Sequence, residues 1–129
     1  MISLSKYQIR LHNLLAQISA NGICSDEGRK QIVIFEKEYN RILSEIKVSV
    51  VDPLQSIPDQ QETYSEFTRY MEDAGKVVKI FCHQYSLNYE DEIQFAKDYG
   101  RLIAAVYGLC RLFCSKEARL KKLGVLNVA

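Results

Sequence analysis

The chain has 129 residues, of which 47% are hydrophobic and 26% are charged, and its formal net charge is +1. This length and composition predict one soluble globular domain whose core is large enough to fold without a disulfide or a metal. The near-neutral charge excludes a protein whose whole surface is basic or acidic, so charge has to be considered segment by segment.

The sequence also carries indications about location. The first residues lack the basic start and apolar run of a secretory signal, and no stretch reaches the ~18 uncharged apolar residues that a spanning helix needs. We therefore expect a cytoplasmic protein without membrane contact. In that compartment the four cysteines would be free thiols.

Two amphipathic helices are predicted before residue 52. The first spans about residues 5–20 and ends at Asn21-Gly22, because glycine accepts the left-handed conformation that follows a helix. The second begins at Ser25 or Asp26, either of which can cap free amides, and we favour helix up to Val51 although the β-branched residues 46–51 also suit an extended segment. Apolar residues recur three and four positions apart at Leu4, Tyr7, Leu11, Leu14 and Ile18, and again at Ile32, Phe35, Tyr39, Ile42 and Ile46.

Both prolines, Pro53 and Pro58, fall in the next segment. Proline removes a backbone donor and clashes with the preceding turn, so helices end near it. Residues 52–59 are therefore a linker between a helical hairpin at 4–51 and a second hairpin at 60–123. Together they form a single domain, 1–129.

Two longer helices are predicted after the linker. The third starts after Asp59 with Glu62 in a capping box and ends near Asn88, and Asn88 is expected to cap the fourth helix. Their apolar seams are Tyr64, Phe67, Met71, Ala74, Val78, Phe81 and Tyr85, then Phe95, Tyr99, Leu102, Val106, Leu109 and Phe113. The sequence thus predicts an all-α fold, an up-down antiparallel four-helix bundle.

The fourth helix is apolar nearly all round over residues 102–114, more than one bundle core requires. A line of small residues also repeats every four positions along it, which would let another helix approach closely. Either this helix is central in the core, or its extra face meets another molecule, including a second copy of the chain. The residues expected at such an interaction face are Ile103, Tyr107, Cys110, Gly100, Ala104 and Gly108.

Cysteine and histidine suggest a metal site only weakly. Cys110 and Cys114 share a helix face, and Cys82-His83 lies on the neighbouring helix, so these residues have the chemistry of zinc ligands. Their spacing is not that of a zinc finger, and free cysteine is commonly buried. We predict core thiols, no metal, no cofactor and no catalytic residues, since no nucleotide loop or nucleophile arrangement is present.

A basic segment lies at the C-terminus. Five cations there accompany one acid, Glu117: Arg111, Lys116, Arg119, Lys121 and Lys122. Such a segment favours contact with phosphates, or simply stabilises the end of a helix. We therefore expect a non-enzymatic helical interaction protein that binds a protein partner through a bundle face, as an adaptor, inhibitor or complex subunit. The alternative is a nucleic-acid-associated subunit that uses the basic segment, and a third interpretation is a thiol or metal protein.

Overall fold

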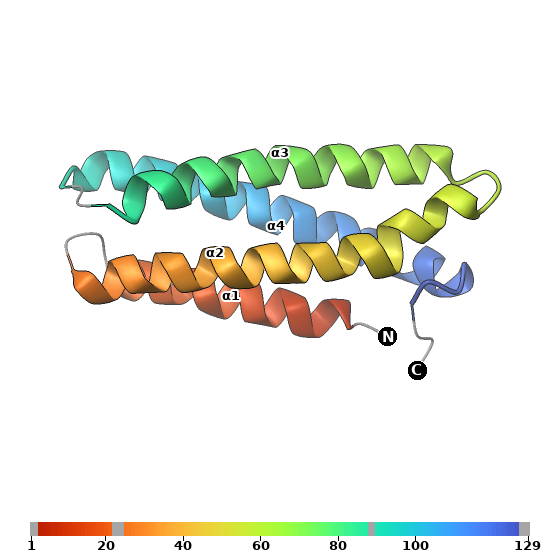
Figure 1. Cartoon of the computed structure of the whole chain (residues 1–129), viewed down its shortest axis with the longest axis horizontal. Helices are drawn as coiled ribbons and strands as arrows, with labels where there is room; N and C mark the ends of the chain where they lie inside the picture. The colour runs from red at the N-terminus through yellow and green to blue at the C-terminus, as the bar shows by residue number, and fades with distance from the viewer. Residues whose placement is uncertain (1–2, 22–24, 88–89, 127–129) are drawn as a thin grey trace.

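Four antiparallel α-helices make up most of the chain (Figure 1). The structure is a computed structural model that describes residues 3–21, 25–87 and 90–126. The helices are α1 (Leu4–Asn21), α2 (Asp26–Ile46), α3 (Gln61–Tyr85) and α4 (Glu92–Lys122), and the described residues contain no strand. The predicted all-α class is confirmed.

The helices pack as two hairpins laid side by side. α1 packs on α2 and α3 on α4, while α2 also contacts α3 and α4 contacts α1. Each helix therefore has two neighbours, which is the predicted up-down arrangement. Both described ends of the chain lie at the same end of the bundle (Figure 1).

The N-terminal cap agrees with the sequence prediction at α2 and differs from it at α3 and α4. The Ser25 side chain accepts the backbone N–H of Gly28 at 2.9 Å, as predicted for α2. The capping box predicted for α3 is wrong, because Gln60 precedes that helix without a capping side chain and Asp59 has a φ of 64°. α4 is capped by Asp91, which accepts the N–H of Gln94 at 3.0 Å. Asn88, the predicted cap, and Gly22 lie outside the described residues.

The linker continues the helical path instead of interrupting it. A π-helical turn, Lys47–Val51, follows α2, and a 3-10 helix, Asp52–Ser56, holds Pro53 near its start. Proline suits that position because its missing N–H is not needed in a first turn. Val50, Val51 and Leu54 are buried. These apolar side chains attach the linker to the core.

The core follows the predicted seams. All the seam residues of α2 are buried, and so are the central members of the other three seams. Five seam residues are only partly buried, namely Tyr7, Tyr64, Met71, Phe95 and Tyr99. Tyrosine at such positions satisfies its hydroxyl, as Tyr99 does by donating to the Leu15 carbonyl at 2.6 Å.

α4 ends in a Schellman motif that returns the chain to the core. Gly124 has a φ of 80°, its N–H donates to the Lys121 carbonyl, and the Val125 N–H donates to the Leu120 carbonyl, both at 3.1 Å. Glycine adopts this left-handed conformation without the strain that a Cβ would add. Leu120, Val125 and Leu126 are buried as a result.

Candidate functional site

The apolar side of α4 that was predicted to meet another molecule is largely turned toward α1. The Tyr107 ring lies 4.3 Å from the His12 ring, centroid to centroid. Cys110 is only 8% exposed and lies beside Leu11 of α1. The assignment of Cys110 to an external contact is therefore wrong, because α1 covers it. Ile103 and Tyr107 are half-buried against the core.

The small-residue ridge of α4, by contrast, is open. Gly100 and Ala104 are exposed, and a Cβ placed on Gly100 or Gly108 would meet no atom within 4 Å. The described helices of this chain do not make the close approach at Gly100 and Gly108 that the ridge would allow. Whether another molecule packs there stays a prediction.

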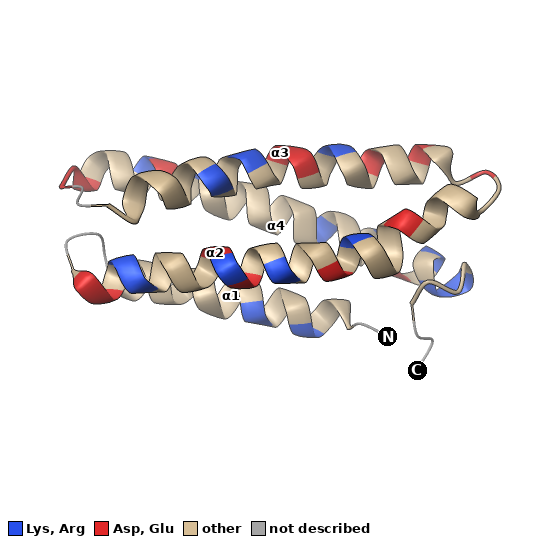
Figure 2. Cartoon of the chain, viewed as in Figure 1, with Lys and Arg blue, Asp and Glu red and all other residues tan. Residues whose placement is uncertain are grey.

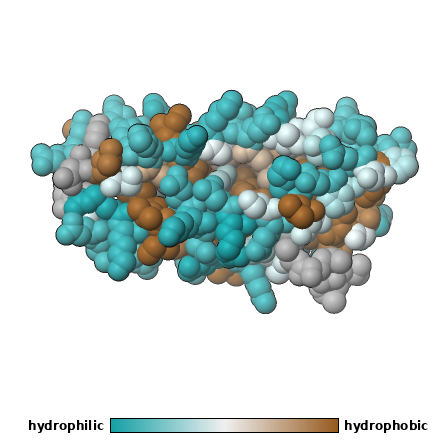
Figure 3. All heavy atoms as spheres, in the orientation of Figure 1, coloured by the Kyte–Doolittle hydropathy of each residue, from teal (hydrophilic) through white to brown (hydrophobic). Residues whose placement is uncertain are grey.

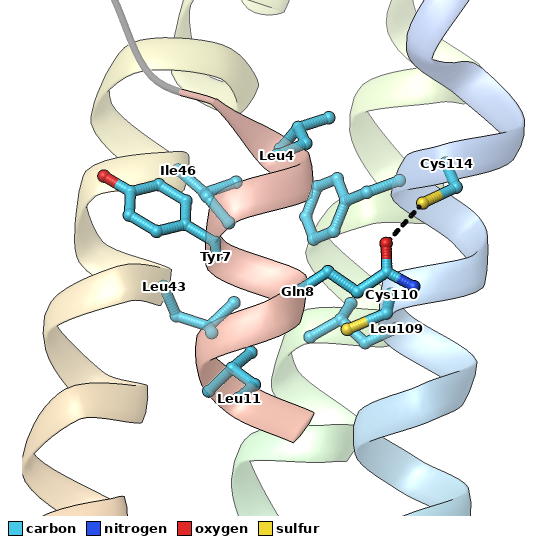
Figure 4. A pocket seen from close by; sticks show the side chains of 10 residues that line it. Leu4, Tyr7, Gln8, Leu11, Leu43, Ile46, Leu109, Cys110 and Cys114 are labelled. Carbon is cyan, nitrogen blue, oxygen red and sulfur yellow. Dashed lines mark hydrogen bonds between the residues drawn. The ribbon is translucent and has the colours of Figure 1, made fainter. Parts of the chain in front are cut away.

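A small cavity lies between α1, α2 and α4 (Figure 4). Its volume is about 20 Å³, and the only polar contact drawn inside it is the Cys114 thiol donating to Gln8 Oε1 at 3.0 Å. A space of this size holds about one water or methyl group, so it is a packing defect and not a ligand site. Its lining consists of Leu4, Tyr7, Gln8, Leu11, Leu43, Ile46, Leu109, Cys110, Phe113 and Cys114.

Two of the described thiols, Cys82 and Cys110, are buried, and the third, Cys114, is exposed. Burial raises the pKa of Cys82 to about 12 and that of Cys110 to about 11. The pKa of Cys114 is also raised, first by burial and then by the Glu117 carboxylate. Low thiolate content makes a cysteine a poor nucleophile and a poor metal ligand. No three His, Cys, Asp or Glu side chains among the described residues are placed to share a metal ion, and Cys24 lies outside them.

Charge is segregated across the bundle. The neighbouring helices α1 and α4 carry nine Lys and Arg against three Asp and Glu, while α2 and α3 carry seven against nine. Figure 2 shows both colours mixed along α2 and α3 and only blue along α1. The net charge of +1 thus conceals a strongly cationic side. We call the solvent-facing residues of α1 and α4 the cationic face.

On α4, the exposed residues of this face are of only two kinds. From residue 96 to residue 122, every exposed residue is either Lys or Arg or has a small side chain. The cations are Lys97, Arg101, Arg111, Arg119 and Lys122, and the small residues are Ala96, Gly100, Ala104, Cys114, Ser115 and Ala118. The two acids of this stretch are half-buried and engaged. Asp98 accepts the Tyr85 hydroxyl at 2.5 Å, and Glu117 lies 3.6 Å from Lys121.

The predicted basic segment divides into paired and unpaired residues. Lys116 lies 3.7 Å from Glu66 of α3, and Lys121 is the partner of Glu117. Among the described residues, no ion pair or side-chain hydrogen bond engages Arg111, Arg119 or Lys122.

Sequence reasoning missed Lys97 and Arg101 as members of the same face. Each directly follows a small residue of the ridge, Ala96 or Gly100. The signal that could have identified them is their own spacing, because two cations four positions apart share one face of a helix.

Comparison with known proteins gives no indication of function. The sequence matches no protein-family model, and no similar protein is found among curated proteins or solved structures. None of the described helices is long and apolar enough to cross a membrane.

Proposed function

We propose that this protein binds nucleic acid through the cationic face of α1 and α4, by contacts to the phosphate backbone. The observation that supports this most is the composition of exposed α4, where the long side chains are all cations and the others are small. Phosphate contacts from Lys and Arg supply most of the affinity of sequence-independent binding. This was the alternative interpretation of the sequence, and the arrangement of the helices now favours it.

A protein partner fits this face less well. The centre of a protein interface is typically apolar, depleted of charge and anchored by aromatic residues. Between residues 96 and 122, α4 offers no exposed large apolar side chain, and α1 adds a single one, Ile9. A nucleic acid needs no apolar contact of this kind, because Lys and Arg side chains spread along the face bind its phosphates.

The dimensions of the face suit an extended phosphate backbone. From Lys97 to Lys122 the helix rises about 37 Å, close to one turn of a DNA duplex. Between Arg101 and Arg111 the exposed residue is Ala104, and Gly108, Ile103 and Tyr107 are half-buried, so no fully extended side chain separates the two cations. We propose non-catalytic binding in the cytoplasm, without a cofactor and without direct reading of base sequence.

The test is fluorescence anisotropy with a short labelled DNA duplex, and with a single strand of the same length, between about 50 and 200 mM salt. One variant removes three unpaired cations of the face, Arg111→Gln, Arg119→Gln and Lys122→Gln. The matched control removes three exposed cations of α2 and α3: Lys30→Gln, Lys37→Gln and Lys76→Gln. Both variants have the same net charge.

We expect the face variant to weaken binding and to reduce the slope of log affinity against log salt by about one per cation removed. The control variant should bind nearly as the unmodified protein does. Equal losses in both variants would show that only net charge matters, and absence of binding at low salt would refute the proposal. Equal competition by poly-glutamate would assign the face to an acidic protein instead.

A further inference from the structure

The exposed cations of α4 form one row along the helix. At 3.6 residues per turn, all five fall within about 80° of the helix circumference: Lys97, Arg101, Arg111, Arg119 and Lys122. Arg101 is paired with Asp98 at 3.2 Å. Among the described residues, no ion pair or side-chain hydrogen bond engages the other four.

The first helix adds less charge to the face than this row does. Its exposed cations are Lys6 and Arg10, and Arg10 lies 3.4 Å from Glu38 of α2. The row on α4 therefore supplies most of the unpaired charge, and its spacing determines which phosphates it can contact.

The unpaired cations of the row match the spacing of backbones along a duplex. From Lys97 to Arg111 the helix rises about 21 Å, and from Arg111 to Arg119 about 12 Å. Their total of about 33 Å is close to the pitch of a DNA duplex, about 34–36 Å. A line along a duplex crosses one backbone, then the other, then the first again, at unequal intervals because the major groove is wider than the minor. The longer interval of the row suits the major groove and the shorter interval the minor groove.

The aromatic rings of α4 are turned into the bundle and are not available to unpaired bases. Each packs on another ring of the protein, with centroids 5.1 Å apart for Phe95 and Tyr85, 5.8 Å for Tyr99 and Phe95, 4.3 Å for Tyr107 and His12, and 4.9 Å for Phe113 and Phe67. No aromatic side chain of α1 or α4 is exposed. Proteins that bind single strands stack successive bases on exposed rings. A duplex needs no such ring, because its bases stack on one another.

A lipid surface is another extended array of phosphates, and the row lacks the apolar side chains that bind to one. Amphipathic helices bind membranes by burying an apolar face at the level of the headgroups. Between residues 96 and 122, α4 has no exposed large apolar residue, and α1 has only Ile9. On the face in view, Figure 3 shows mostly hydrophilic atoms with separate apolar patches, so that face offers no continuous apolar surface either.

We infer that the ligand of the cationic face is a double-stranded nucleic acid, which lies along α4 so that Lys97, Arg111 and Arg119 contact three successive crossings of its two backbones. This inference rests on the nucleic-acid binding proposed above and adds the class of nucleic acid and its orientation. Arg101 and Lys122 lie next to the first and third contacts and add charge there.

The test measures anisotropy at several salt concentrations with three labelled ligands: DNA hairpins with stems of 6 and 14 base pairs, and an oligothymidine strand as long as the larger hairpin. At about 3.4 Å per base pair, the short stem spans about 20 Å and the long stem about 48 Å. Only the long stem can reach all three contacts at once. The variant is Lys97→Gln, and the matched control is Lys37→Gln, which removes an exposed cation of α2.

We expect the long hairpin to bind roughly tenfold or more tightly than oligothymidine or the short hairpin. Lys97→Gln should reduce the slope of log affinity against log salt by about one with the long hairpin. The slope with the short hairpin should stay unchanged, because that stem still binds between Arg111 and Lys122. Lys37→Gln should alter neither slope.

The failure of this inference can be distinguished from failure of nucleic-acid binding itself. Oligothymidine that binds as tightly as the long hairpin, or equal slope changes with both hairpins, would overturn duplex binding along α4 and leave nucleic-acid binding intact. Release of the long hairpin by phosphatidylserine vesicles at equal phosphate concentration would assign the row to a lipid surface. Absence of binding to all three ligands at about 50 mM salt would refute both proposals.

Discussion

Replacing Gly100 and Gly108 with alanine tests whether the ridge of α4 is uncovered. Both glycines lie inside a 31-residue helix, where glycine is less favourable than alanine by about 0.8–1 kcal/mol. A Cβ at either position would meet no atom within 4 Å, so no steric cost opposes this gain. Each substitution should therefore raise the free energy of unfolding by about 0.8–1 kcal/mol.

The two effects should add. The glycines are separated by eight residues, about 12 Å along the helix axis, which is far enough for independent contributions. With an unfolding entropy of about 2.1 cal/mol/K per residue, a chain of 129 residues gains about 4 °C in Tm per kcal/mol. The double variant should then melt about 7 °C higher than the unmodified protein.

Thermal unfolding followed by circular dichroism, repeated over a range of protein concentrations, measures these shifts. Gly124→Ala is the control with opposite sign, because its φ of 80° makes a side chain costly by about 1–2 kcal/mol. A lower Tm for Gly108→Ala at every concentration would refute the open ridge. A loss that appears only at high concentration would show that a second copy packs there, as the sequence suggested.

Two further predictions concern titratable groups. In a Cys24→Ser background, a maleimide should modify Cys114 alone in the native state, because Cys114 is exposed while Cys82 and Cys110 are buried. The rate of modification should rise with pH, because the pKa of this thiol is raised and the thiolate is the reactive form. Modification of all three thiols before unfolding would contradict the buried assignments. The hydrogen bond from Tyr85 holds the pKa of Asp98 below its usual value, so this contact stabilises the fold above the unfolded-state pKa of about 3.9 and is lost as the pH falls through the folded-state pKa. Tyr85→Phe should therefore reduce stability at pH 7 more than at pH 2, which urea unfolding at both pH values measures; an equal loss at both would indicate a packing effect alone.

The helices and their buried faces were predictable because helical periodicity is a local property. Residues such as Ile42 and Val78 recur with the spacing that places them on one stripe, and only burial of that stripe stabilises the helix. The ends of helices were less predictable. Asp91 and Asn88 are both competent caps, and the choice between them depends on where the hairpin turns.

The candidate sites depended on the tertiary structure to a greater degree. The sequence shows that α4 is apolar nearly all round, but it does not show that α1 covers Tyr107 and Cys110. His12 and Tyr107 meet across 95 positions of sequence, a contact that no local pattern encodes.

The sequence by itself determined the four helices, the division into two hairpins by the segment 52–59 and the charge that each helix carries, since these follow from local spacing and composition. Only the tertiary structure decided that α1 and α4 are neighbours, and hence that the two helices with an excess of cations lie side by side. The physical reason is that a helix chooses its neighbours by complementary packing of side chains distant in sequence.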